Sequence, residues 1–277
     1  MAKRAGFCFG VKRAVKLAYE TASHKRGPVY TLGPIIHNPQ VVNDLESWGV
    51  KTIEKPSQAR KGTVIIRSHG IHPQVLKDLW TRQSLKVVDA TCPFVTKAQR
   101  AAACLHGEGR QVIIVGERRH PEVIALRGYA GPESLVFNRR VARVGRRVGV
   151  LAQTTLSTED FVKAINYLSS RTEDLHLINT ICQATQVRQQ DTMQLAKRAD
   201  LMIVVGGRNS ANTSRLAELC RKVGKPTYHL ETEMELKASW FKGARLAGVT
   251  AGASTPDSLV KKVVERIRDL TRTKGRA

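Results

Sequence analysis

Residues 87–105, VVDATCPFVTKAQRAAACL, pass from a β-branched run through Cys92 into the pattern of an amphipathic helix. The same order occurs in AGFCFGVKRAVKLAYETA, residues 5–22, around Cys8, and in LINTICQATQVRQQDTMQLAKRA, residues 177–199, around Cys182. A repeat of such length decides the architecture of a chain. We therefore expect three similar units, each with a cysteine where a strand or turn leads into a helix.

Two further segments recur after each cysteine, and each consists of a strand, a loop with a polar residue, and a helix. The first segment occurs at residues 29–45, 111–126 and 201–219, and its polar residues are His37, His120 and Ser210. The second occurs at residues 62–79, 147–168 and 244–267, and its polar residues are His69, Thr154 and Ser254. Equivalent polar residues at matched places indicate one repeated design.

The repeated strand–helix order predicts an α/β protein of three small domains with parallel sheets, in residues 1–90, 91–178 and 179–277. Prolines suited to a first helical turn mark helix starts at Pro39, Pro73, Pro121 and Pro256. Functional groups of parallel sheets gather beyond the carboxyl ends of the strands. We expect all three cysteines and all six polar residues at such ends, in a pseudo-threefold trefoil around one central site.

The composition narrows the class of protein. A chain of 277 residues with 42% hydrophobic content can bury a sizeable core. It has no apolar run long enough to cross a bilayer, and its first residues do not resemble a signal peptide, so we expect a cytoplasmic protein. The five cysteines are dispersed, which favours reduced thiols or metal ligands over disulfides.

The net charge of +23 fits nucleic acid, an acidic protein partner or an anionic substrate. The basic residues are scattered and aromatic residues make up only 5%, so a base-stacking surface is poorly supported and nucleic acid is not expected.

Three convergent thiolates suit an iron–sulfur cluster or zinc. Structural zinc sites commonly use close CxxC pairs, and the sequence has none. A 4Fe-4S cube held by three cysteines keeps one iron without a protein ligand, and this open iron can accept a substrate oxygen. Cys104 and Cys220 fall on helical stretches and are interpreted as small buried hydrophobes.

The sequence resembles the family of 4-hydroxy-3-methylbut-2-enyl diphosphate reductases, also called IspH or LytB proteins. The resemblance is carried in order by GFCFGVKRAV, HNPQVV, SHG, DATCPFVTKAQ, HPEV, QTTLS, NSANTSRLAEL and GVTAGASTPD, and extends from about residue 4 to residue 270. Any one string is weak evidence, whereas the ordered set is highly specific.

The resemblance implies the role of each site residue. One 4Fe-4S cluster per chain would have Cys8, Cys92 and Cys182 as ligands and one open iron. Glu122 would supply protons together with Thr154. The substrate diphosphate would be bound by His37, His69, His120, Ser210, Asn212 and Ser254, with Thr154 beside it. Ala211 stands where the family usually has a second serine, so one hydroxyl contact is missing.

These roles agree with the chemistry of the residues. Imidazoles, hydroxyls and an amide near helix N-termini suit a polyanionic diphosphate. The histidines could instead bind a metal, but soft sulfur ligands and an anionic substrate make that interpretation weaker. A carboxyl group in a closed site can have its pKa raised and act as a proton donor. His72 is interpreted as structural, and His24, His106, His176 and His229 as surface groups.

The implied reaction removes the allylic hydroxyl of the substrate with two electrons and two protons and gives isopentenyl and dimethylallyl diphosphates, in the last step of the methylerythritol phosphate route to isoprenoids. The sequence has no flavin or dinucleotide fingerprint, so a ferredoxin or flavodoxin is the expected electron donor. Two alternatives stay open from the residues: a quinolinate synthase-like dehydratase with the same cysteine geometry, and a basic nucleic-acid-binding protein with a structural metal.

Overall fold

The computed structural model describes residues 1–24, 27–137, 139–141 and 143–272. Nine α-helices occur in these ranges, and three short 3-10 helices cover Pro56–Gln58, Glu233–Glu235 and Ala238–Phe241. The α-helices are α1 (Phe9–Ser23), α2 (Pro39–Ser47), α3 (Pro73–Trp80), α4 (Pro93–Gly107), α5 (Pro121–Tyr129), α6 (Thr158–Ser169), α7 (Gln183–Arg198), α8 (Ala211–Lys222) and α9 (Asp257–Arg272).

The strands form three small sheets, and every strand pair in them is parallel. The first sheet has the order β2 (Val50–Ile53), β1 (Val29–Leu32), β3 (Gly62–Ile66), β4 (Leu85–Asp89). The second has the order β6 (Leu135–Phe137), β5 (Gln111–Val115), β7 (Arg147–Ala152), β8 (Asp174–Ile178). The third has the order β10 (Thr227–Leu230), β9 (Leu201–Val205), β11 (Ala247–Ala251).

The predicted α/β class with three small parallel sheets is therefore confirmed. Sheet membership changes between β4 and β5 and again between β8 and β9. The chain divides into two compact units, one of residues 10–36 and 40–182 and the other of residues 1–9, 37–39 and 183–277. The division into domains 1–90, 91–178 and 179–277 and their arrangement about a threefold axis stay predictions.

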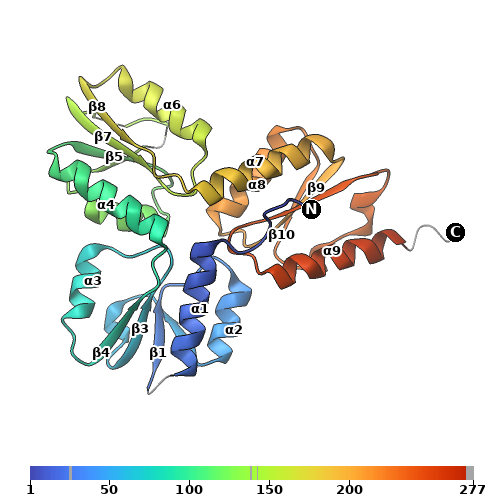
Figure 1. Ribbon diagram of the computed structural model, residues 1–277, viewed down its shortest axis with the longest axis horizontal. Coiled ribbons are helices and arrows are strands. Elements are labelled where there is room, and N and C mark those ends of the chain that lie inside the picture. The colour runs from blue at the N-terminus through green and yellow to red at the C-terminus, as the bar shows by residue number, and fades with distance from the viewer. Residues whose placement is uncertain (25–26, 138, 142, 273–277) are drawn as a thin grey trace. The chain divides into compact units, whose positions relative to one another are not determined.

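Helices cover both faces of the second sheet because alternate residues of its strands point in opposite directions. Ile113 and Val115 pack with Phe161 of α6, whereas Val112 and Ile114 pack with Leu105 of α4. Figure 1 shows α4 and α6 on either side of this sheet. The third sheet follows the same principle, with Ile203 packed beside Val260 of α9 and Met202 beside Leu216 of α8.

The first strand of each sheet lies between the second and third, so the connections leave it in opposite directions. Such a switch point opens a crevice beyond the carboxyl ends of the central strands. Helix starts follow the expected prolines: α2, α3 and α5 begin at Pro39, Pro73 and Pro121, and α9 begins directly after Pro256. Among the described helices, none has both the length and the apolar character needed to cross a membrane. The cytoplasmic location stays a prediction.

Candidate active site

The polar residues predicted for the site follow the two strands that flank each switch point. His37 and His69 follow β1 and β3, His120 and Thr154 follow β5 and β7, and Ser210 and Ser254 follow β9 and β11. Cys92 and Cys182 follow the fourth strands, β4 and β8. Cys8 differs from the prediction, because residues 1–8 form turns and bends and no strand precedes this cysteine.

Each of the three cysteines is fixed by the same backbone hydrogen bond. The N–H of Cys92 donates to the carbonyl of Ser68 at 2.9 Å, and that of Cys182 donates to the carbonyl of Thr154 at 2.9 Å. The N–H of Cys8 donates to the carbonyl of Ala253 at 3.1 Å. A loop that ends a strand thus holds each cysteine, so Cys8 is placed without a strand of its own.

The residues before Cys92 and Cys182 explain the turns. The carboxylate of Asp89 accepts a hydrogen bond from the N–H of Thr91 at 2.8 Å, and the side-chain oxygen of Asn179 accepts one from the N–H of Ile181 at 3.0 Å. Such Asx turns direct the chain from a strand into the next helix. The sequence patterns DATC and NTIC therefore carry the same local structure.

The cysteine side chains are half-buried and each stands immediately before or at the start of a helix: α1, α4 or α7. The positive end of a helix favours negatively charged sulfur there. Gly10 adjoins one thiol so closely that a Cβ on it would lie 2.3 Å from Sγ of Cys92. The guanidinium of Arg13 donates to the carbonyl of Thr91 at 3.1 Å. Gly10 and Arg13 were not singled out as site residues, although both belong to the GFCFGVKRAV motif.

The backbone bonds also set the register of the repeat. Ser68, Thr154 and Ala253 all accept the bond from a cysteine, so they are equivalent positions. The residue that corresponds to His69 and Ser254 is therefore Thr155, one position beyond the Thr154 that the sequence spacing matched to them. The site role assigned to Thr154 rests on its own contacts rather than on the repeat.

Those contacts join Thr154 to Glu122. The backbone N–H of Thr154 donates to Oε1 of Glu122 at 2.6 Å, and its hydroxyl donates to Oε2 at 2.8 Å. Glu122 is only 2% exposed. Burial raises the pKa of the Glu122 carboxyl to about 7, against the lowering effect of both hydrogen bonds from Thr154. Glu122 therefore exchanges its proton near neutral pH.

His120 is the N-cap of α5, two residues before Glu122. Its Nδ1 accepts a hydrogen bond from the N–H of Glu122 at 3.2 Å, which places the proton of the neutral ring on Nε2. The ring of His69 meets that of His120 edge to face, with centroids 5.5 Å apart. The loops after β3 and β5 thus bring two predicted site histidines together, beside Glu122.

A second group of predicted residues lies in the unit of residues 1–9, 37–39 and 183–277. The hydroxyl of Ser254 donates to the carbonyl of His37 at 3.1 Å and to the hydroxyl of Ser210 at 3.4 Å. Ser210 caps α8 by accepting from the N–H of Thr213. Asn212 is 4% exposed, and neither its amide nitrogen nor its amide oxygen has a hydrogen-bond partner among the described residues.

Buried polar groups normally have partners, so an orphaned amide is a place where a ligand can bind. The hydroxyls of Ser210 and Ser254 and the buried amide of Asn212 can all donate hydrogen bonds, which is the composition expected of an anion site.

The structure tests the interpretation of Cys104 and Cys220 as small buried hydrophobes and of His72 as a structural residue. Cys220 is fully buried in the core between α7 and α8, as predicted. Cys104 was predicted to be buried and this was wrong, because it lies on the exposed side of α4, where Sγ contacts Oε1 of Glu108 at 3.6 Å. His72 is the N-cap of α3, and its Nδ1 accepts from the N–H of Gln74, in agreement with a structural role.

These features define an α/β protein of three parallel sheets, in which strand-end loops position cysteines and histidines and the first turn of α5 carries a buried acid. The family model described as "LytB protein" matches residues 1–268, and the chain belongs to this family. The resemblance seen in the sequence is thereby confirmed.

Curated relatives match over nearly the whole chain. The 4-hydroxy-3-methylbut-2-enyl diphosphate reductase of Geobacter sulfurreducens is 50% identical over 278 residues, covering 99% of this chain and 98% of the relative. The enzyme of the same name from Aquifex aeolicus is 44% identical and covers 98% of this chain and 96% of its own.

Solved structures of reductases also match this chain over nearly its whole length. A structure of (E)-4-hydroxy-3-methyl-but-2-enyl diphosphate reductase, described as the terminal enzyme of the non-mevalonate pathway, is 44% identical with a TM-score of 0.71, over 97% of this chain and 98% of that one. The E-1-hydroxy-2-methyl-but-2-enyl-4-diphosphate reductase from Plasmodium falciparum is 28% identical with a TM-score of 0.88, over 96% of this chain and 86% of its own.

Proposed function

We propose that the protein is a 4-hydroxy-3-methylbut-2-enyl diphosphate reductase, an oxidoreductase of isoprenoid synthesis. The observation that carries this function is the near-full-length identity of 44–50% with reductases of that name. The reaction takes up two electrons and two protons, breaks the allylic C–O bond, releases water, and yields isopentenyl or dimethylallyl diphosphate.

The thiols fit the 4Fe-4S cluster that we propose as the cofactor. All five cysteines are free of disulfides, and Cys8, Cys92 and Cys182 share the same backbone anchor and the same place at a helix start. Three thiolates are suitable ligands for iron and would leave one iron without a protein ligand. When bound, the cluster supplies electrons singly and a Lewis-acidic iron for the substrate hydroxyl.

The chain's own residues would bind the diphosphate. Asn212 offers a buried amide for anionic oxygens, beside the hydroxyls of Ser210 and Ser254. His120, whose Nδ1 accepts from the backbone, carries its ring proton at Nε2 and can donate it to a phosphate oxygen. We propose His37 and His69 as further ligands of the same anion, which raises the affinity of an imidazole for a second proton.

Glu122 would deliver a proton to the departing hydroxyl. Its carboxyl is enclosed, its pKa of about 7 keeps it protonated in a large share of molecules at neutral pH, and Thr154 fixes both of its oxygens. A general acid works best when its pKa lies near the operating pH. The hydroxyl of Thr154 completes a short relay, because it can pass a proton while it keeps a hydrogen bond to Glu122.

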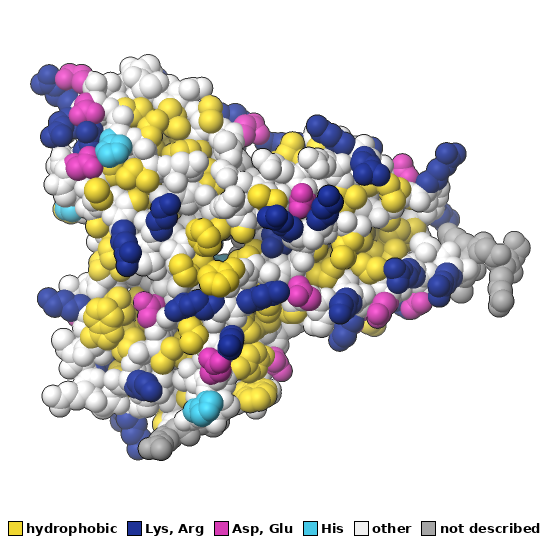
Figure 2. Space-filling model, viewed as in Figure 1, with side chains coloured by type: hydrophobic (Ala, Val, Ile, Leu, Met, Phe, Trp, Pro, Cys, Tyr) yellow, Lys and Arg dark blue, Asp and Glu magenta, His cyan; other side chains and the backbone are white. Residues whose placement is uncertain are grey.

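The two electrons must come from a donor outside the chain, and we propose an acidic ferredoxin or flavodoxin. The support is electrostatic: the net charge is +23, and Figure 2 shows Lys and Arg side chains spread over the visible face, with a smaller number of Asp and Glu side chains among them. A surface of this sign attracts acidic partners at long range.

The test is an anaerobic assay of the reconstituted protein with (E)-4-hydroxy-3-methylbut-2-enyl diphosphate and dithionite-reduced methyl viologen. We expect isopentenyl and dimethylallyl diphosphates by mass spectrometry. Cys182→Ser should lose most of the bound iron and the activity, whereas Cys104→Ser, a change of an exposed thiol outside the site, should keep both. A reconstituted wild-type protein that binds iron but consumes no substrate would refute the proposed reaction.

A further inference from the structure

A cavity of about 460 Å³ lies between the start of α3, one side of α5 and the loop of residues 131–134, and none of the proposed active-site residues is among its described lining. All of its lining residues belong to the unit of residues 10–36 and 40–182. Its volume falls in the range of small-molecule sites. Nothing in the proposed reaction uses it.

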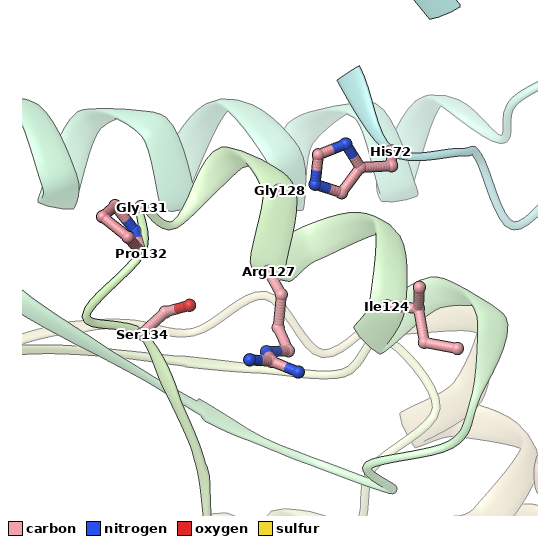
Figure 3. Close-up of a pocket in the computed structure, with 7 residues that line it drawn as sticks. All are labelled: His72, Ile124, Arg127, Gly128, Gly131, Pro132 and Ser134. Atoms are coloured by element: carbon pink, nitrogen blue, oxygen red, sulfur yellow. The ribbon is translucent and has the colours of Figure 1, made fainter. Parts of the chain in front are cut away.

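The polar groups of the cavity are those that bind anions. Arg127, on the last turn of α5, contributes a guanidinium, and Ser134 contributes a hydroxyl from a residue that is only 5% exposed. Figure 3 shows the Arg127 side chain leaving α5 on the side where Ser134 lies. His72 adds an imidazole whose Nδ1 accepts from Gln74, so Nε2 is the donor. No Asp or Glu is among the described lining residues.

Two glycines in the cavity lining let histidine rings pack closely against the backbone. A Cβ on Gly128 would lie 2.5 Å from Cδ2 and 2.6 Å from Nε2 of His72, so only glycine lets the imidazole pack onto α5. Gly131 has φ +81°, and a Cβ there would meet the ring of His106 at 2.4 Å. The apolar side chain of Ile124 and the ring of Pro132 form the remaining wall. The cavity therefore combines a cationic part with a short apolar part.

We propose that this cavity is a second ligand site, which binds a small organic phosphate. A guanidinium pairs with two phosphate oxygens at once, and a hydroxyl and an imidazole N–H can bind the others. The apolar wall accommodates the carbon part of such a molecule. This site does not depend on the proposed reductase activity.

Occupation of the cavity would act on α5. This helix carries Arg127 near its end and His120 and Glu122 at its start. A ligand held between Arg127, His72 and Ser134 would restrain the helix against α3 and the following loop, which lowers the frequency of local opening. Slower amide exchange along α5 is the signature of binding at this place.

Inorganic pyrophosphate and glycerol 3-phosphate serve as probes for the holoprotein, with hydrogen–deuterium exchange as the readout. We expect both probes to slow exchange in peptides covering residues 123–137. Arg127→Gln should require about tenfold more probe for the same protection, as loss of one charge-assisted hydrogen bond predicts. Arg100→Gln, a change of an exposed arginine on α4, is the matched control and should behave as wild type.

Binding at the proposed active site would protect residues 37–42 and 209–216 and, through His120, the start of α5 as well. The cavity is therefore read from the part of the protection of residues 123–137 that Arg127→Gln removes, while protection of residues 37–42 and 209–216 stays as in wild type. Ser134→Ala provides a second variant that removes only the hydroxyl, and it should also weaken protection of residues 123–137. The proposal would be overturned if the probes did not protect residues 123–137 in wild type, or if they protected them equally in wild type and in Arg127→Gln. A lowered melting temperature of Arg127→Gln with unchanged probe binding would show that Arg127 only stabilises the end of α5.

Discussion

At the residue scale, two opposing effects set the pKa of Glu122. Burial raises its pKa to about 7, while the N–H and the hydroxyl of Thr154 favour the carboxylate. Desolvation is the larger effect, since the folded pKa exceeds the ordinary value of 4.5. The sequence predicted an acid at the helix start next to His120, but the strength of its burial depends on how the loop after β7 closes over α5.

The raised pKa makes folding stability depend on pH. The folded state binds a proton at Glu122 that the unfolded state has lost between about pH 4.5 and pH 7, so this contribution is full below pH 4.5 and disappears as pH rises through 7. The difference between the unfolded and folded pKa values corresponds to roughly 3 kcal/mol of unfolding free energy. We expect Glu122→Gln to gain stability relative to wild type as pH rises from 5 to 8, measured by thermal unfolding. A difference that is constant with pH would show that Glu122 ionises normally.

Thr154 should set the pH at which the enzyme loses activity. Thr154→Val removes the hydroxyl donor to Glu122 but keeps the backbone N–H, so the carboxylate is less favoured and the pKa of Glu122 rises further. The alkaline limb of the kcat profile with methyl viologen should then move to higher pH, while Thr154→Ser should restore the wild-type limb. If the limb moved to lower pH in Thr154→Val, the assignment of Glu122 as the acid would be wrong.

Glu122 itself should matter more for turnover than for binding. Glu122→Gln keeps the shape of the side chain and one acceptor for Thr154 but cannot supply a proton. We expect kcat to fall about 100-fold or more, as for loss of a general acid, with little change in KM. Parallel loss of substrate binding would point to a structural role instead.

At the scale of elements, the strand-end loops were predictable because parallel strands feed helices through loops on one edge of a sheet. The prolines marked the helix starts, and DATC and NTIC carried the Asx turns before two cysteines. Cys8 could not be placed this way, because it takes its anchor from the carbonyl of Ala253, at the other end of the chain. Cys104 was misjudged because helical periodicity alone did not show which face of α4 is covered.

Gly10, on α1, lies against the thiol of Cys92, which directly precedes α4, and it should control cluster assembly. A Cβ at this position would lie 2.3 Å from Sγ of Cys92, so α1 or the thiol must move in Gly10→Ala. We expect a lower iron content per chain and weaker absorbance near 400 nm after reconstitution. Gly107→Ala is the control, because a Cβ there meets nothing within 4 Å. Full iron content in Gly10→Ala would mean that the helix yields without disturbing Cys92.

At the scale of the whole molecule, the internal repeat predicted three parallel sheets, and the family match is consistent with that design. The two alternatives, a quinolinate synthase-like dehydratase and a nucleic-acid-binding protein, gain no support from the family match or the curated relatives. Spacing alone misplaced the repeat at Thr154 by one residue, because hydrogen-bond register, rather than distance along the chain, defines equivalent positions.

The net charge of +23 should appear in the kinetics of reduction. Long-range attraction raises the association rate of an acidic protein donor and is screened as salt increases, because the Debye length falls from about 10 Å at 0.1 M to about 3 Å at 1 M. With reduced ferredoxin or flavodoxin, kcat/KM for the donor should fall about tenfold or more between 0.05 M and 0.5 M NaCl. Methyl viologen, a small cation that needs no docking, should show little decline in the same buffers. An equal salt response with both donors would place the effect on the substrate diphosphate or on the enzyme itself, and the basic surface would then have no part in delivering electrons.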